Sequence, residues 1–138
     1  MEKEFDILNH TADVGIIAYG ASLNQAFANA ARGLFSLITD LDDVEEALSR
    51  DIEVTAPDQE SLLVAWLNEL IYRFDVENIL FNRFDVTQLD STRLKARTYG
   101  EKVDSSRHKL KTGVKATTYH MLKVEKTNGY QVQVLFDI

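Results

Sequence analysis

The feature that most constrains the fold is an apolar stripe in the middle of the chain. Between positions 60 and 75 apolar side chains recur every three or four residues, which places them on one face of an α-helix. The stripe consists of Leu63, Trp66, Leu67, Leu70, Ile71 and Phe74. Pro57 and Asp58 precede it and supply a chain break and a helix cap. The stripe therefore predicts a helix over 60–75 that buries Trp66 in a hydrophobic core.

A second helix is predicted over 22–38. Ser22 and Gln25 have the three-residue spacing of a capping box at its start. Apolar residues again share one helical face, namely Leu23, Phe27, Ala30, Leu34, Leu37 and Ile38. This face is expected to belong to the same core.

The segment 39–46 that follows is acidic and predicts a solvated loop or a short helical turn. It is not an EF-hand calcium loop. Counted from Asp40, such a loop needs glycine at the sixth position and glutamate at the twelfth, where this chain has Glu45 and Asp51.

Alternation of apolar and polar residues predicts strands in the rest of the chain. The predicted strands cover 5–8, 14–19, 52–56, 80–86, 94–99, 114–126 and 130–137. Asp90–Thr92 and Asn128–Gly129 separate neighbouring strands and favour antiparallel hairpins. The polar segment 100–111 is expected to be a loop in which His108 is solvated. We predict an α+β fold with two long amphipathic helices packed on a largely antiparallel β-sheet.

Length and charge limit the classes of partner. The chain has 138 residues without a repeat or linker, which predicts one domain over 1–138. It has 15 Lys and Arg against 22 Asp and Glu, a formal charge of −7 that opposes direct nucleic-acid binding and favours a protein or cation partner. The absence of cysteine excludes disulfides, thiolate zinc sites and cysteine catalysis. Without a signal-peptide pattern or a long apolar run, the chain is expected to be cytoplasmic and not membrane-bound.

Acidic groups stand at both ends of the chain. Asp13 lies in a turn before the strand 14–19, and Asp137 precedes the last residue, Ile138, with its main-chain carboxylate. Asp13 has a plain structural explanation as a turn cap, and Asp137 as a solvated terminal residue. Alternatively, these carboxylates are hard oxygen ligands that suit Ca²⁺ or Mg²⁺, and packed together they would repel one another without a cation. In the last strand Asp137 also points away from the main apolar face.

The sequence predicts no catalytic residue. It has no glycine-rich phosphate loop, nucleophile elbow or His-x-x-x-His pair. A metal-assisted hydrolase built from His10, Asp13 and His120 stays open as a weaker hypothesis, because neighbouring strands could bring these distant residues together.

Three motifs of this chain resemble the archease family. They are HTADVG at 10–15, VKATTYH at 114–120 and VLFDI at 134–138. They occur in the family's order, and the resemblance spans essentially the whole chain. One departure is Thr117, where an apolar residue is expected.

The resemblance implies an accessory protein that assists the tRNA-splicing RNA ligase, an enzyme that joins exon halves through a histidine-bound guanylate. Such a protein promotes guanylylation and multiple turnover of the ligase and is not itself the ligase. The resemblance also implies a divalent-cation site at Asp13, Asp137 and the main-chain carboxylate of Ile138. Ca²⁺ is the expected cation, with Mg²⁺ or Mn²⁺ as alternatives.

Further residues take a role from the resemblance. Lys115 matches a family lysine tied to activity on the ligase, although a lysine on a strand surface is commonplace. His10, Asp40 and His120 are carried over as further candidates for partner binding or activity. The competing function is a more general chaperone or modulator of RNA-modifying enzymes.

Overall fold

The computed structural model describes residues 3–9 and 13–138 of the chain. The helices are α1 (Leu23–Ile38), the 3₁₀ turn η1 (Leu41–Asp43) and α2 (Gln59–Glu77). The strands are β1 (Phe5–Asn9), β2 (Asp13–Gly20), β3 (Leu48–Thr55), β4 (Ile79–Leu89), β5 (Arg93–Lys102), β6 (Ala116–Lys126) and β7 (Tyr130–Asp137). Neither α1 nor α2 combines the length and apolar composition that crossing a membrane requires.

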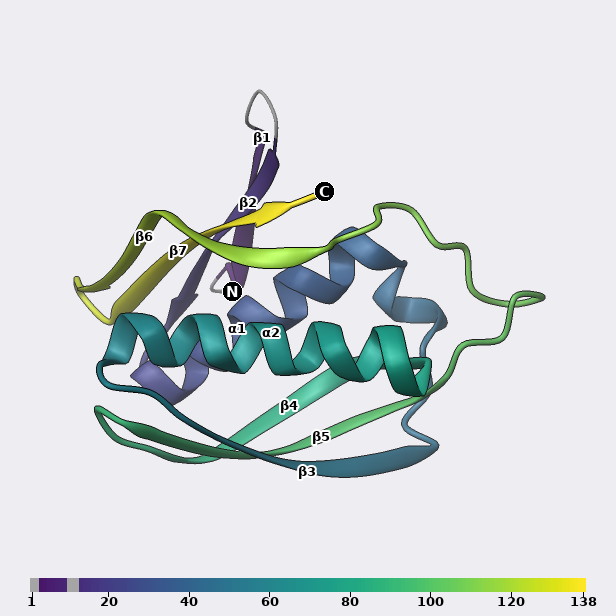
Figure 1. The fold of residues 1–138 in the computed structure, drawn as a ribbon, viewed down its shortest axis with the longest axis horizontal. Helices are drawn as coiled ribbons and strands as arrows, with labels where there is room; N and C mark the ends of the chain where they lie inside the picture. Colours follow the sequence, from purple (N-terminus) through teal and green to yellow (C-terminus); the bar gives the residue numbers. More distant parts are fainter. Residues whose placement is uncertain (1–2, 10–12) are drawn as a thin grey trace.

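The two long helices lie between two antiparallel sheets (Figure 1). One sheet has the strand order β1-β2-β7-β6 and the other β3-β5-β4. α1 packs against β2 and β4, while α2 packs against β6 and β3. The α+β prediction is confirmed, and the strands that were expected to form one sheet are divided between two. The two predicted hairpins are present as the antiparallel pairs β4–β5 and β6–β7.

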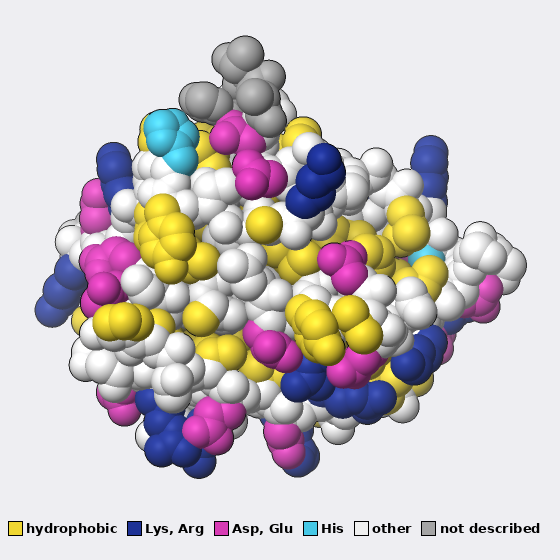
Figure 2. All heavy atoms as spheres, in the orientation of Figure 1, with side chains coloured by type: hydrophobic (Ala, Val, Ile, Leu, Met, Phe, Trp, Pro, Cys, Tyr) yellow, Lys and Arg dark blue, Asp and Glu magenta, His cyan; other side chains and the backbone are white. Residues whose placement is uncertain are grey.

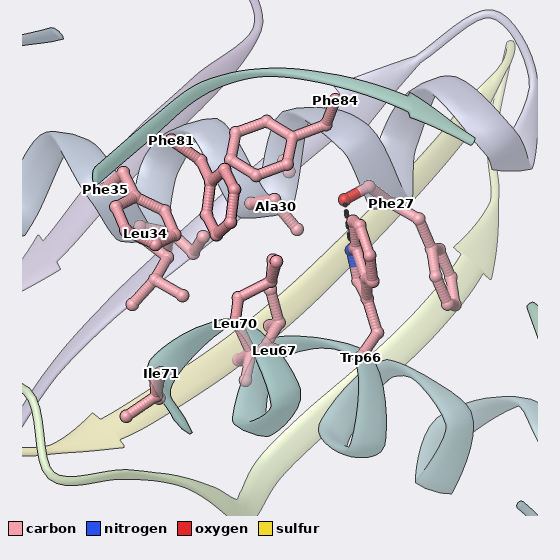
Figure 3. Close-up of a cluster of buried hydrophobic side chains, with 14 of the residues drawn as sticks. Phe27, Ala30, Leu34, Phe35, Trp66, Leu67, Leu70, Ile71, Phe81 and Phe84 are labelled. Atoms are coloured by element: carbon pink, nitrogen blue, oxygen red, sulfur yellow. Dashed lines mark hydrogen bonds between the residues drawn. The ribbon is translucent and has the colours of Figure 1, made fainter. Parts of the chain in front are cut away.

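The apolar stripe lies in the core as predicted (Figure 3). Trp66 is fully buried, and its indole N–H donates to the carbonyl oxygen of Phe27 at 3.0 Å. This bond joins α2 to α1 and supplies the partner that a buried N–H requires. The rings of Phe35 and Phe81 meet edge to face with centroids 5.7 Å apart, and Trp66 meets Phe84 similarly at 6.1 Å.

Both helices begin at the predicted caps. The Ser22 hydroxyl accepts from the Gln25 amide at 3.1 Å, and the Asp58 carboxylate accepts from the Ser61 amide at 2.8 Å. These bonds satisfy amides that the first turn of a helix leaves without a backbone partner. α2 continues to Glu77, slightly beyond the predicted end, and stops at Asn78 in the left-handed conformation with φ 57°.

The prediction for residues 100–111 is wrong at its start. β5 continues through Lys102, and Gly100 is buried within it. A side chain at Gly100 would meet the backbone of β4, because a Cβ atom there would lie 2.8 Å from the Cα atom of Phe81. The expectation that His108 is solvated is also wrong, since this residue is only 4% exposed. The strand predicted over 114–126 begins two residues later, because β6 starts at Ala116.

Thr117 buries its hydroxyl group where β6 packs against α2. The residue is 7% exposed, and among the described residues its Oγ1 has no hydrogen-bond partner. A buried polar group without a partner costs about 1–3 kcal/mol. The departure from the apolar residue expected here is therefore a local loss of stability.

We expect Thr117→Val to raise the free energy of unfolding by about 1 kcal/mol, because the isosteric methyl group needs no hydrogen bond. Urea unfolding monitored by circular dichroism measures this change. The matched control is Thr118→Val, which removes an acceptor for the His120 amide at 3.2 Å and should not stabilise the protein. A Thr117→Val variant no more stable than the parent would contradict the prediction.

Candidate functional site

Asp13 and Asp137 meet at one end of the four-stranded sheet. β2 and β7 are antiparallel neighbours, and Asp13 pairs directly with Asp137. Directly paired residues have Cα atoms about 4.5–5.5 Å apart and side chains on the same face. This face is turned away from the helices, because the core residues Val14 and Phe136 occupy the alternate positions. The prediction that Asp137 points away from the main apolar face is confirmed.

These acidic groups differ in exposure. Asp13 is partly buried, Asp137 is exposed, and Ile138 beyond it is 47% exposed. Like charges directly across a strand pair repel each other, so the arrangement favours a bound cation. Carboxylate oxygens are the ligands that Ca²⁺ and Mg²⁺ prefer.

The two side-chain carboxylates of Asp13 and Asp137 are too few to hold a calcium ion. The main-chain carboxylate of Ile138 must also act as a ligand. Across residues 3–9 and 13–138, no three His, Asp or Glu side chains gather as metal ligands. A cation here would therefore be held by the side chains of Asp13 and Asp137, the main-chain carboxylate of Ile138 and water. Calcium accepts such mixed oxygen sets because its coordination is flexible.

Lys115 lies beside this end of the sheet. Its amide donates to the carbonyl oxygen of Asp137 at 2.8 Å, and its side chain is exposed. The next residue, Ala116, pairs with Asp137. The structure thus brings Lys115 together with the three proposed metal-binding residues. In the region where Figure 1 marks the C-terminus, Figure 2 shows acidic side chains next to a basic one.

The remaining candidates are more widely distributed. Asp40 is in the turn after α1, where its carboxylate accepts from the Asp42 amide at 3.1 Å and caps η1. His120 is exposed on β6, four residues after Ala116. His10 lies outside the described residues.

The loop before Lys115 is fastened to the end of α1. The amides of Lys111 and Thr112 donate to the carbonyl oxygens of Ile38 and Leu37 at 2.8 and 3.2 Å. These bonds satisfy carbonyl groups that the end of a helix leaves without a partner. The loop is thereby held as it leads to Lys115.

A buried polar network that the sequence did not reveal fixes the beginning of this loop. Glu101 is 7% exposed and accepts from the Glu45 amide at 2.7 Å and from Arg107. His108 Nε2 lies 3.0 Å from both Glu101 and the carbonyl oxygen of Asp43. The Asp104 amide donates to His108 Nδ1 at 2.9 Å, so the proton of the neutral imidazole is on Nε2.

The network also sets the charge of Glu101. Burial alone raises the pKa of this carboxyl, but hydrogen bonds from Arg107, the Glu45 amide and His108 outweigh it and hold the pKa below the usual value. Glu101 is therefore an anion that neutralises Arg107 and orders the loop. No local sequence pattern indicates this role, because its partners lie in segments that read as polar loops.

The comparisons with known proteins agree on the family. The chain matches the Archease protein family (MTH1598/TM1083) over residues 5–138. It is 45% identical to the protein archease of Saccharolobus islandicus, with 99% of each chain covered. It is 40% identical to that of Methanosarcina mazei, covering 99% of this chain and 97% of the relative.

Solved structures share the fold. The solution structure of protein 1598 of Methanobacterium thermoautotrophicum superposes with a TM-score of 0.85 at 37% identity, covering 98% of this chain and 99% of that one. An archease crystal structure from Thermotoga maritima gives a TM-score of 0.64 over 100% of this chain and 98% of that one. At 20% identity, the latter shows the fold alone. From the family match, the full-length relatives and the shared fold, we conclude that this chain belongs to the archease family.

Proposed function

We propose that this chain is an accessory protein that activates the tRNA-splicing RNA ligase by promoting its guanylylation and multiple turnover. The observation that carries the proposal is the direct pairing of Asp13 with Asp137 beside Ile138 and Lys115. Each of the three archease motifs contributes a described residue to this place: Asp13 from the first, Lys115 from the second and Asp137 from the third. The proposed role is that of an activator in the cytoplasm rather than an enzyme.

The proposed cofactor is one divalent cation, Ca²⁺ in the first place and Mg²⁺ or Mn²⁺ as alternatives. A bound cation would neutralise carboxylates that otherwise repel each other. Asp13 and Asp137 would hold it from neighbouring strands, and the carboxylate of Ile138 would complete the protein ligands. The last residues of β7 would then have a fixed position against the start of β2.

The charge of the chain fits a protein partner that itself binds RNA. The formal net charge is −7, and the proposed site is acidic. A ligase must present basic groups to the phosphates of its RNA, so the two surfaces are complementary and their encounter is accelerated. Direct binding of this chain to RNA is not proposed.

A second candidate is a more general chaperone or modulator of RNA-modifying enzymes. The solved Thermotoga maritima protein is described as an archease and possible chaperone, which is the observation that favours it. The range of proteins captured by the immobilised chain separates the two functions. Capture of one RNA ligase supports the specific activator, whereas capture of many unrelated RNA-modifying enzymes supports the chaperone.

The functional test is RNA ligation with substrate in large excess over the cognate ligase. We expect ligation to continue for many turnovers in the presence of the chain and to stop after about one without it. Equal product with and without the chain would show that the proposal is wrong.

We expect Ca²⁺ to raise the melting temperature of the parent protein and to have little effect on Asp13→Asn or Asp137→Asn. At a free Ca²⁺ concentration of about 100 Kd, binding to the folded state alone adds about 2.7 kcal/mol to the free energy of unfolding. Loss of one carboxylate ligand should weaken binding by about 100-fold, because affinity depends on the number of charged ligands. Differential scanning fluorimetry and calorimetric titration measure both quantities.

The matched control is Asp42→Asn, which removes an exposed carboxylate from the acidic turn and should leave Ca²⁺ binding unchanged. If Ca²⁺, Mg²⁺ and Mn²⁺ all fail to stabilise the parent, the cation site is not there.

A further inference from the structure

β6 carries a bulge with two exposed apolar side chains. Its pairing with β7 shifts between Thr118 and Lys123, and residues 119–122 form what we call the β6 bulge. Tyr119 is 63% exposed and Met121 is 46% exposed. β6 is an edge strand of its sheet, so no further strand of the described residues covers the bulge.

The β6 bulge is held in a defined conformation. Met121 has φ 56°, in the left-handed region that residues other than glycine rarely adopt. The side-chain amide of Gln133, which is 9% exposed, donates to the Met121 carbonyl oxygen at 2.9 Å. The His120 amide donates to the Thr118 hydroxyl at 3.2 Å. The conformation is therefore ordered before any partner binds, which lowers the entropy cost of binding.

Protection of the sheet edge does not account for these side chains. A bulge prevents edge-to-edge pairing by its backbone geometry, and polar side chains serve that purpose better. Exposed aromatic and methionine side chains are instead enriched at the centres of protein interfaces. The net charge of −7 disfavours nucleic acid and anionic membrane as the occupant, which leaves a protein.

The position of the β6 bulge relates it to the acidic end of the sheet. Ala116 pairs with Asp137, and the bulge begins at Tyr119 on the same strand. At a rise of about 3.3 Å per residue, the two lie about 10 Å apart. A protein interface of standard size, about 800 Å² per partner, extends further than this distance. A protein centred on the bulge is therefore expected to reach the carboxylate end, where basic groups would complement it.

We propose that the β6 bulge is the element by which this chain docks on the RNA ligase, with Tyr119 and Met121 entering an apolar pocket beside the ligase's basic RNA-binding surface. This inference rests on the proposed function, since it takes the ligase as the partner. It assigns binding to the bulge and activation to the carboxylate end.

The test is the dissociation constant of the complex with the cognate ligase, measured by isothermal titration calorimetry. We expect the double variant Tyr119→Ala/Met121→Ala to bind about tenfold more weakly or worse than the parent. The matched control is Tyr72→Ala/Val76→Ala, which removes side chains that are 53% and 58% exposed one turn apart on α2. The control should bind within about twofold of the parent.

Melting temperatures establish that the variants are folded, and the single variant Tyr119→Ala decides the matter if the double variant is unstable. If the bulge variants bind as tightly as the parent, or if the parent does not bind the ligase, the docking inference is wrong. A parent that binds through the bulge but does not stimulate the ligase overturns the proposed function and supports the docking inference.

Discussion

Replacing Glu101 with alanine is expected to lower the free energy of unfolding by about 3 kcal/mol. The reason is that one carboxylate satisfies three donors, namely Arg107, the Glu45 amide and His108 Nε2. Without it, the Glu45 amide loses its acceptor and Arg107 loses its ion pair. The buried His108 imidazole keeps only the Asp43 carbonyl oxygen as a partner for Nε2. Urea unfolding of the parent and variant at neutral pH measures the difference.

The matched control is Glu53→Ala, which removes a strand glutamate whose ion pair with Arg93 is exposed. Exposed pairs contribute about 0–1 kcal/mol, so this variant should stay close to the parent. Equal losses in Glu101→Ala and Glu53→Ala would show that the buried network does not stabilise the fold.

The same carboxylate predicts how stability changes with pH. The pKa of Glu101 is below its usual value of 4.5 in the folded protein, so the folded state binds fewer protons than the unfolded state. Its stabilising contribution is fully present above pH 4.5 and is lost as the pH falls through the lower folded value. Glu101→Gln should therefore lose less stability than the parent on acidification, which urea unfolding between about pH 6 and about pH 3 measures.

The second large effect is expected at the neighbouring residue. Gly100→Ala should lower the free energy of unfolding by about 3 kcal/mol. The new Cβ atom would lie 2.8 Å from the Cα atom of Phe81 and would overlap the Leu80 carbonyl group. These are backbone atoms of β4, so a change of side-chain rotamer cannot relieve the overlap. α1 packs against β4, so the strand itself cannot shift without disturbing that packing.

Gly113→Ala is the matched control, because a Cβ atom at that glycine meets nothing within 4 Å. It should leave stability unchanged or raise it by less than about 1 kcal/mol. If the Gly100→Ala and Gly113→Ala proteins have the same melting temperature, the close approach of β5 to β4 is contradicted.

The helices and hairpins could be predicted from the sequence, because the patterns that indicate them are local. The stripe around Trp66, the caps at Ser22 and Asp58, and the Asn128–Gly129 turn each lie within a few neighbouring residues. The division of strands between two sheets could not be predicted in this way. It depends on which faces α1 and α2 cover, and single-strand patterns carry no information about distant partners.

The segment from Gly100 to His108 shows why polar composition misleads. Its polar residues resemble a solvated loop, yet Glu101 and His108 are buried because they pair with Arg107 and with residues about 60 positions earlier in the chain. The residues of the candidate cation site, by contrast, could be identified from the sequence. Its two acidic residues were identified at the ends of two predicted strands, and the pairing of β2 with β7 then brought them together.

The most direct test of ligase activation is single-turnover guanylylation of the cognate RNA ligase with GTP. The parent is compared with Asp13→Asn, Asp137→Asn and Lys115→Ala at saturating concentration, after melting curves have shown that each variant is folded. We expect the parent to accelerate the step and the two carboxylate variants to lose the acceleration, with Lys115→Ala also impaired. A parent that leaves the rate unchanged would contradict the proposed activation, and full acceleration by the carboxylate variants would contradict the role of the cation site.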